Sequence, residues 1–142
     1  MNPSLRGSFE TILVVDDNAM VLRNVIAVLE AASFTVLSAD NGPSALNLAD
    51  RTSETIDLLL SDVEMPQMSG PELGWALKKT RPDMHVMLMS GGANGNLLLL
   101  NYGWAFIQKP FLSGELVQMV NNLLHPASRS RPGGDERQPE GR

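Results

Sequence analysis

Short apolar runs alternate along the chain with longer segments in which apolar residues recur at helical spacing. The runs are brief and rich in β-branched residues, which is typical of strands buried on both faces of a parallel sheet. We therefore expect five strands, at residues 11–15, 34–37, 56–60, 84–89 and 104–108.

Capping and turn residues mark helices between those runs. Asn18 and Ser113 each precede an amphipathic stretch, so both are predicted N-caps. Asn41-Gly42-Pro43 opens another helix, because proline fits the first helical turn. The expected helices lie within 18–29, 41–49, 71–80, 93–101 and 113–124.

Strand and helix thus alternate five times, which predicts an α/β fold with right-handed crossovers and helices on both faces of the sheet. The length of 142 residues suits one domain, expected at 11–125. Residues 1–10 are polar and predict a flexible leader. Residues 126–142 are rich in Pro and Gly with a single apolar side chain, which predicts a disordered tail.

Composition and charge exclude several classes of protein. Residues 1–125 carry 13 acidic and 7 basic side chains, a poor match for nucleic acid or an anionic membrane. The absence of cysteine excludes disulfides, thiolate catalysis and cysteine-bound zinc. The first ten residues hold no apolar signal segment and the longest leucine run is too short to span a bilayer, so we expect a cytoplasmic protein.

Polar side chains follow four of the predicted strands. Asp16 and Asp17 follow the first, Asp62 the third, Ser90 the fourth and Lys109 the fifth. In an open parallel sheet these positions share the edge where ligands bind. Crowded carboxylates favour a hard cation such as Mg²⁺. With a lysine and a hydroxyl beside them, an aspartate could accept a phosphoryl group as an acyl phosphate.

Each of these residues alone has a simpler interpretation. An aspartate after a strand is commonly a turn residue, the Asp16-Asp17 pair could cap the first helix, and a single lysine is commonly solvated. Their coincidence at the ends of four strands favours the phosphoryl site.

Four spaced motifs resemble the receiver domain of two-component response regulators. They are ILVVDDN at 12–18, LLSDVEMPQMSG at 59–70, MSG at 89–91 and FIQKPF at 106–111. The second and fourth are similar to receivers attached to, or serving, hybrid histidine kinases. The resemblance covers about residues 10–125 and implies a flavodoxin-like (βα)5 fold with strand order 2-1-3-4-5. It also implies a cis peptide before Pro110.

The resemblance implies a role for each site residue. Asp62 would be the phosphoacceptor and Lys109 the ammonium that binds the phosphoryl group, while Ser90 and Phe106 would move as a switch. The implied Mg²⁺ ligands are Asp16 (largely through water), Asp17, Asp62 and the backbone carbonyl of Glu64. The stretch from Ser90 to Lys109 is a few residues shorter than is usual in the family, so we expect a short or distorted fourth helix.

The implied function is a phosphoacceptor module rather than an enzyme, stand-alone or excised from a longer protein. Its partners would be a histidine kinase or histidine phosphotransfer protein and an unspecified downstream protein, with a homodimer left open. An alternative is a degenerate receiver that binds partners without phosphorylation, against which the complete acidic set argues. A phosphatase would need Asp-x-Asp after the first strand and a substrate cap, and an FMN carrier would need a Ser/Thr/Gly loop there.

Overall fold

The computed structural model describes residues 10–91 and 103–126, and within them five parallel strands form one sheet in the order β2-β1-β3-β4-β5. The strands are β1 (Thr11–Val15), β2 (Thr35–Ala39), β3 (Leu58–Asp62), β4 (His85–Ser90) and β5 (Ala105–Gln108). The helices are α1 (Ala19–Ala31), α2 (Gly42–Arg51), α3 (Gly70–Lys78) and α5 (Ser113–Leu124). The predicted fold class and strand order are confirmed. The expected helix at 93–101, residues 1–9 of the expected leader and the tail from 127 lie outside the described residues.

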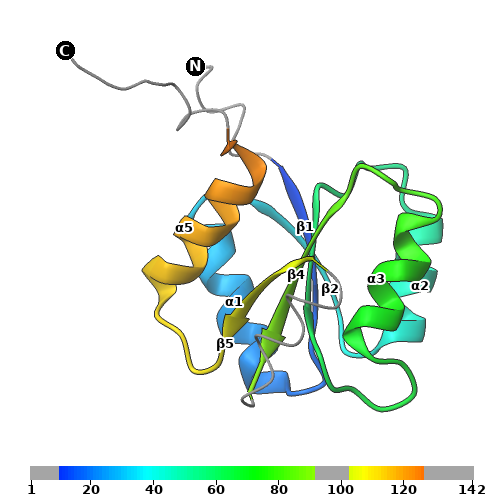
Figure 1. The fold of residues 1–142 in the computed structure, drawn as a ribbon, viewed down its shortest axis with the longest axis horizontal. Helices are drawn as coiled ribbons and strands as arrows, with labels where there is room; N and C mark the ends of the chain where they lie inside the picture. The colour runs from blue at the N-terminus through cyan, green and yellow to red at the C-terminus, as the bar shows by residue number, and fades with distance from the viewer. Residues whose placement is uncertain (1–9, 92–102, 127–142) are drawn as a thin grey trace.

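Helices cover both faces of the sheet, α1 and α5 on one side and α2 and α3 on the other (Figure 1). Alternate residues of the central strands feed two separate cores, since successive strand side chains point to opposite faces. Leu13 and Leu59 pack with α2 and α3, whereas Val14 and Leu60 pack with α1 and α5. All four are completely buried, as the continuous apolar runs predicted.

β1 has the predicted bounds, whereas the bounds of the other four strands differ by one or two residues from those expected. Phe34 and Ile56 are buried as predicted but lie outside the strands. An apolar run reports burial, whereas a strand is defined by its hydrogen bonds, so the two need not coincide. β3 and β4 also extend beyond their predicted ends, to Asp62 and Ser90. Both of these site residues therefore occupy the last position of a strand.

Helix N-termini follow the sequence signals in part. The Asn18 side chain accepts hydrogen bonds from the backbone N–H groups of Met20 and Val21, so this predicted cap is confirmed. Ser113 is not a cap, and that prediction was wrong. The residue at the cap position is Leu112, which makes no side-chain hydrogen bond, because the backbone is already helical at Ser113.

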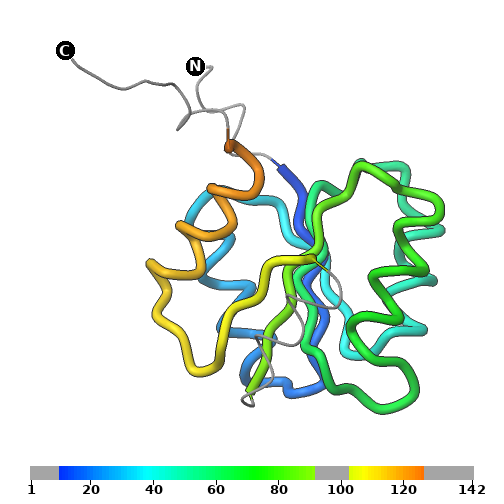
Figure 2. Tube along the Cα trace, viewed as in Figure 1, coloured from blue at the N-terminus to red at the C-terminus, as the bar shows by residue number. Residues whose placement is uncertain are grey.

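The start of β1 and the end of α5 lie side by side, as Figure 2 shows. The Glu10 carboxylate and the His125 ring form a contact of 2.9 Å between Oε1 and Nε2. Within the described residues, no helix is long and apolar enough to cross a membrane.

The two tryptophans of the chain, Trp75 in α3 and Trp104 just before β5, form a pair. Their ring centroids lie 5.0 Å apart, and Trp75 is half-exposed rather than buried. Trp104 lies directly against the backbone of Gly74, where an added Cβ would meet two of its ring carbons at 2.9 Å. The glycine therefore allows the indole ring to pack against α3.

We expect Gly74→Ala to lower the free energy of unfolding by about 1–3 kcal/mol, because the new methyl group overpacks this contact. Gly114→Ala is the matched control in α5, since nothing lies within 4 Å of its added Cβ. That control should be neutral or stabilised by up to about 1 kcal/mol through helix propensity. Urea denaturation measures both, and equal stabilities for the two variants would contradict the packing role of Gly74.

Candidate functional site

The strand ends bring the predicted acidic residues and lysine together at one edge of the sheet. Asp16 follows β1 directly, Asp62 ends β3 and Lys109 follows β5. The Lys109 ammonium lies 3.0 Å from Asp16 Oδ2 and 3.1 Å from Asp62 Oδ1. One ammonium thus bridges carboxylates from two different strands.

Asp16 is held rigidly below the surface. Its side chain is completely buried, and its second oxygen, Oδ1, accepts a hydrogen bond of 2.8 Å from the backbone N–H of Asn18. A buried carboxylate requires such partners, because leaving it unpaired would carry a large desolvation cost. The start of α1 and Lys109 together fix the position of this negative charge.

The site shifts the pKa values of Asp62 and Lys109 upward. Burial raises the pKa of Asp62, and the nearby Asp16 charge adds to the rise, while the hydrogen bond from Lys109 only partly opposes it. Burial by itself lowers the pKa of Lys109, but the hydrogen bonds and charges of Asp16 and Asp62 outweigh it and leave that pKa raised. Lys109 is therefore a stable ammonium at neutral pH.

Three carboxylates are close enough to share one cation. Asp16, Asp17 and Asp62 each offer an oxygen, and these oxygens all lie within 4.8 Å of one another. Asp17 is exposed, so the cluster opens to solvent. A small all-oxygen site open to water fits Mg²⁺, which retains several of its water ligands. Glu64 is exposed two residues beyond Asp62, and its carboxylate is not part of the cluster.

The two predicted switch residues lie on neighbouring strands. Ser90 is buried at the end of β4, and its carbonyl accepts a hydrogen bond from the Lys109 backbone N–H at 2.8 Å. Phe106 is opposite Leu88 in the β4–β5 register and packs against the α2/α3 core. The peptide bond between Lys109 and Pro110 is cis, as expected.

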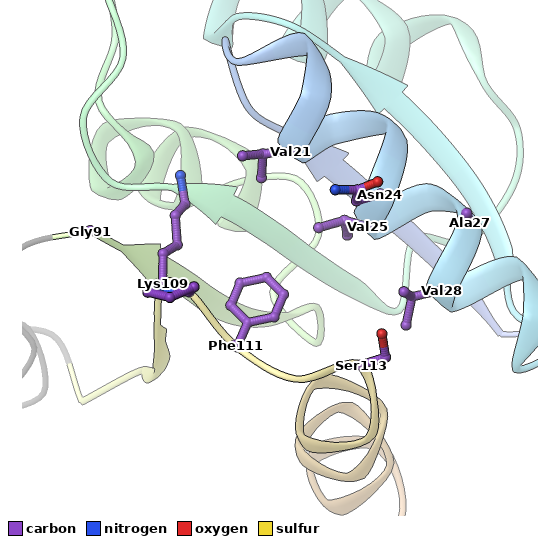
Figure 3. A pocket seen from close by; sticks show the side chains of 10 residues that line it. Val21, Asn24, Val25, Ala27, Val28, Gly91, Lys109, Phe111 and Ser113 are labelled. Atoms are coloured by element: carbon purple, nitrogen blue, oxygen red, sulfur yellow. The ribbon is translucent and has the colours of Figure 1, made fainter.

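Two features of this region were not predicted. Ser61, directly after the predicted strand at 56–60, is completely buried and donates a hydrogen bond of 2.9 Å to the backbone carbonyl of Asp62. An open groove of about 620 Å³ also runs beside Lys109, between α1 and the segment that leads into α5 (Figure 3). Val21, Val25 and Phe111 give this groove an apolar lining. The signal available in the sequence for a buried Ser61 was its position directly after an apolar run. The groove had no such signal, because it depends on how the helices pack.

Comparison with known proteins identifies relatives of the whole described fold. The response regulator receiver domain family matches residues 12–121. The sensor kinase CckA of Brucella abortus is 34% identical over 123 residues, which cover 84% of this chain and 13% of the kinase. The transcriptional regulatory protein CpxR of Escherichia coli K12 is 36% identical over 115 residues, which cover 80% of this chain and 48% of CpxR. The chain thus spans about half or less of the length of these relatives.

Solved structures agree with this assignment. The receiver domain of the hybrid histidine kinase CckA superposes with a TM-score of 0.65 and 32% identity, covering 81% of this chain and 99% of that domain. The response regulator TrrA of Thermotoga maritima, solved with Mg²⁺-BeF, gives a TM-score of 0.72 and 28% identity, covering 81% of this chain and 99% of TrrA. Because the family match runs from β1 almost to the end of α5, the chain belongs to the response regulator receiver domain family of two-component signalling systems.

Proposed function

We propose that Asp62 accepts a phosphoryl group from a phosphohistidine donor. The supporting observation is the Lys109 ammonium 3.1 Å from Asp62 Oδ1, inside a cluster of carboxylates. An Asp62 oxygen forms the new O–P bond as the N–P bond of the donor breaks, and the departing imidazole takes up a proton. Lys109 is placed to neutralise a phosphoryl oxygen while that bond forms.

Asp16, Asp17 and Asp62 would hold Mg²⁺, with the backbone carbonyl of Glu64 as a further ligand. When bound, Mg²⁺ supplies positive charge that neutralises the phosphoryl oxygens. The donor set supports this assignment, since it consists of oxygens alone and leaves one side open to water.

Ser90 and Phe106 would carry the phosphorylation signal away from the site. The Ser90 hydroxyl donates a hydrogen bond to a phosphoryl oxygen on Asp62 and is drawn toward it. Phe106, one strand away on the same face of the sheet, then turns into the space left beside Ser90. The surface around β5 changes shape, as in switches driven by a newly added charge.

The chemical form of the label tests the acceptor chemistry. An acyl phosphate on Asp62 is released by neutral hydroxylamine, whereas a phosphate ester on Ser90 survives that treatment. We expect complete release from protein labelled by a small phosphodonor. Label that resists hydroxylamine would assign the acceptor to a hydroxyl group and overturn the proposal.

Mg²⁺ should stabilise the folded protein, since it relieves repulsion among three carboxylates. At ten times its Kd, one bound ion adds about 1.4 kcal/mol to the free energy of unfolding. That corresponds to a rise in Tm of about 5 °C for a domain of this size. Asp17→Asn should lose most of the rise, whereas Asp40→Asn, exposed after β2 at the same edge, should keep it. A full Mg²⁺ response in Asp17→Asn would exclude Asp17 as a ligand.

The donor is best placed against the groove beside Lys109. A phosphohistidine must reach Asp62. Lys109 lines this groove (Figure 3), and its ammonium pairs with the Asp62 carboxylate. Val21 and Val28 of α1 and Phe111 beyond β5 offer apolar contact to a docked helix. We therefore place the histidine kinase or phosphotransfer partner on the α1 side of the acceptor.

Ala27→Arg tests this placement, because it puts a long charged side chain on the exposed α1 wall of the groove. We expect transfer from a phosphohistidine protein to fall at least about tenfold, as for truncation of a central interface contact. Labelling by a small phosphodonor should be unchanged, since Asp62 is untouched. Asn47→Arg, exposed on α2, is the matched control. Equal transfer from the protein donor to both variants would move the docking surface elsewhere.

A further inference from the structure

The peptide unit that follows Asp62 is held at both of its polar groups. Its N–H, on Val63, donates to the carbonyl of Met89 in β4 at 3.0 Å. Its carbonyl, on Asp62, accepts the Ser61 hydroxyl at 2.9 Å. The next carbonyl, on Val63, accepts the backbone N–H of Gly70 at 2.9 Å. The backbone just after the acceptor therefore has little freedom to tilt.

Gly70 closes the space above this peptide unit. A Cβ added to Gly70 would lie 2.3 Å from the Asp62 carbonyl oxygen and 3.2 Å from Ser61 Oγ. The first turn of α3 thus packs directly on the hydrogen bond between Ser61 and Asp62. Because Ser61 is completely buried, water cannot easily replace its hydroxyl as the hydrogen-bond donor to the Asp62 carbonyl.

We propose that Ser61 is a positioning residue for the phosphoacceptor. It acts through the Asp62 backbone and touches neither donor nor phosphoryl group, so the proposal depends on the acceptor role of Asp62. The side-chain direction of Asp62 follows from its backbone, and so does the path of the chain to Glu64. Without the hydroxyl, the unpaired carbonyl turns toward another donor and carries the Asp62 carboxylate away from its place beside Lys109.

The test compares Ser61→Ala with Ser61→Thr, which restores a hydroxyl, and with Ser38→Ala, a matched control at an exposed position of β2. Labelling rates are measured with a small phosphodonor at saturating concentration and saturating Mg²⁺, at a temperature where every variant is folded. We expect about a tenfold lower maximal rate for Ser61→Ala, since small misplacements of reacting groups slow reactions strongly. Ser61→Thr should recover most of the rate, and Ser38→Ala should match wild type.

A purely structural role for Ser61 predicts a different pattern. Ser61→Ala would then have a lower Tm but a wild-type maximal rate, and that result would overturn the proposal. Should Ser61→Ala fail to fold, Ser61→Cys carries the same test, because a thiol is a weaker donor than a hydroxyl. A wild-type rate in the folded cysteine variant would equally overturn it. Failure of wild type itself to be labelled would refute the acceptor role of Asp62, a distinct outcome from equal rates in wild type and variant.

Discussion

Lys109→Gln is expected to slow phosphoryl transfer to Asp62 by about a hundredfold or more, the usual loss when one preorganised charge-stabilising group is removed from a reacting site. Glutamine preserves polarity but removes the positive charge that lies 3.0 Å from Asp16 and 3.1 Å from Asp62. In the variant, the phosphoryl group must approach carboxylates without that compensating charge. The maximal labelling rate with a small phosphodonor at saturating Mg²⁺ measures the effect.

Lys78→Gln is the control for the loss of a hydrogen-bonded lysine. The Lys78 ammonium donates to the carbonyls of Pro82 and Met84, away from the acidic cluster. This variant should keep the wild-type labelling rate even if it is less stable. A loss of less than threefold in folded Lys109→Gln would contradict the role given to the ammonium.

Asp62→Asn is expected to be more stable than wild type at neutral pH in the absence of divalent cations. Burial and the neighbouring Asp16 raise the pKa of Asp62, so its ionised form is held in the fold at a cost. Asparagine removes this negative charge while keeping the shape of the side chain. The gain should be on the order of 1 kcal/mol, which is within the ordinary range for a single substitution, and urea denaturation without divalent cations measures it.

The stability difference between wild type and Asp62→Asn should also depend on pH. The folded protein binds the Asp62 proton more tightly than the unfolded chain, whose carboxyl has the ordinary pKa of 3.8. The stability contributed by Asp62 therefore falls as the pH rises from that value through the folded pKa. The unfolding free energies of wild type and Asp62→Asn should converge in acid and separate toward neutral pH. Asp40→Asn, the control, should follow wild type throughout. If Asp62→Asn is less stable than wild type at neutral pH, the repulsion between the Asp62 and Asp16 carboxylates is refuted.

The sequence was sufficient to predict the fold and most of the candidate site. The fold follows from the alternation of strands and helices, and the site follows from the residues at the strand ends. Alternating apolar runs and amphipathic segments leave few topologies other than a parallel sheet covered on both faces. Residues that follow such strands must meet at one edge, so Asp16, Asp62 and Lys109 could be grouped without coordinates. Their distances of 3.0 and 3.1 Å agree with that grouping.

Features that depend on backbone geometry could not be predicted in the same way. Ile56 is buried outside β3, and the backbone becomes helical at Ser113 itself, one residue before a serine cap would place it. The Trp75–Trp104 pair and the groove beside Lys109 arise where separate elements approach each other. No local pattern of residue types specifies such approaches, because they are set by packing of the completed fold.

The measurement that tests the acceptor role most directly is the intact mass of the protein after incubation with a small phosphodonor and Mg²⁺. Wild type is expected to gain the mass of one phosphoryl group, only when Mg²⁺ is present, while Asp62→Asn gains none. A folded, Mg²⁺-replete wild-type protein that gains no mass would favour a receiver that binds partners without phosphorylation. An equal gain in wild type and Asp62→Asn would place the phosphoryl group on another residue, and either result would contradict Asp62 as the phosphoacceptor.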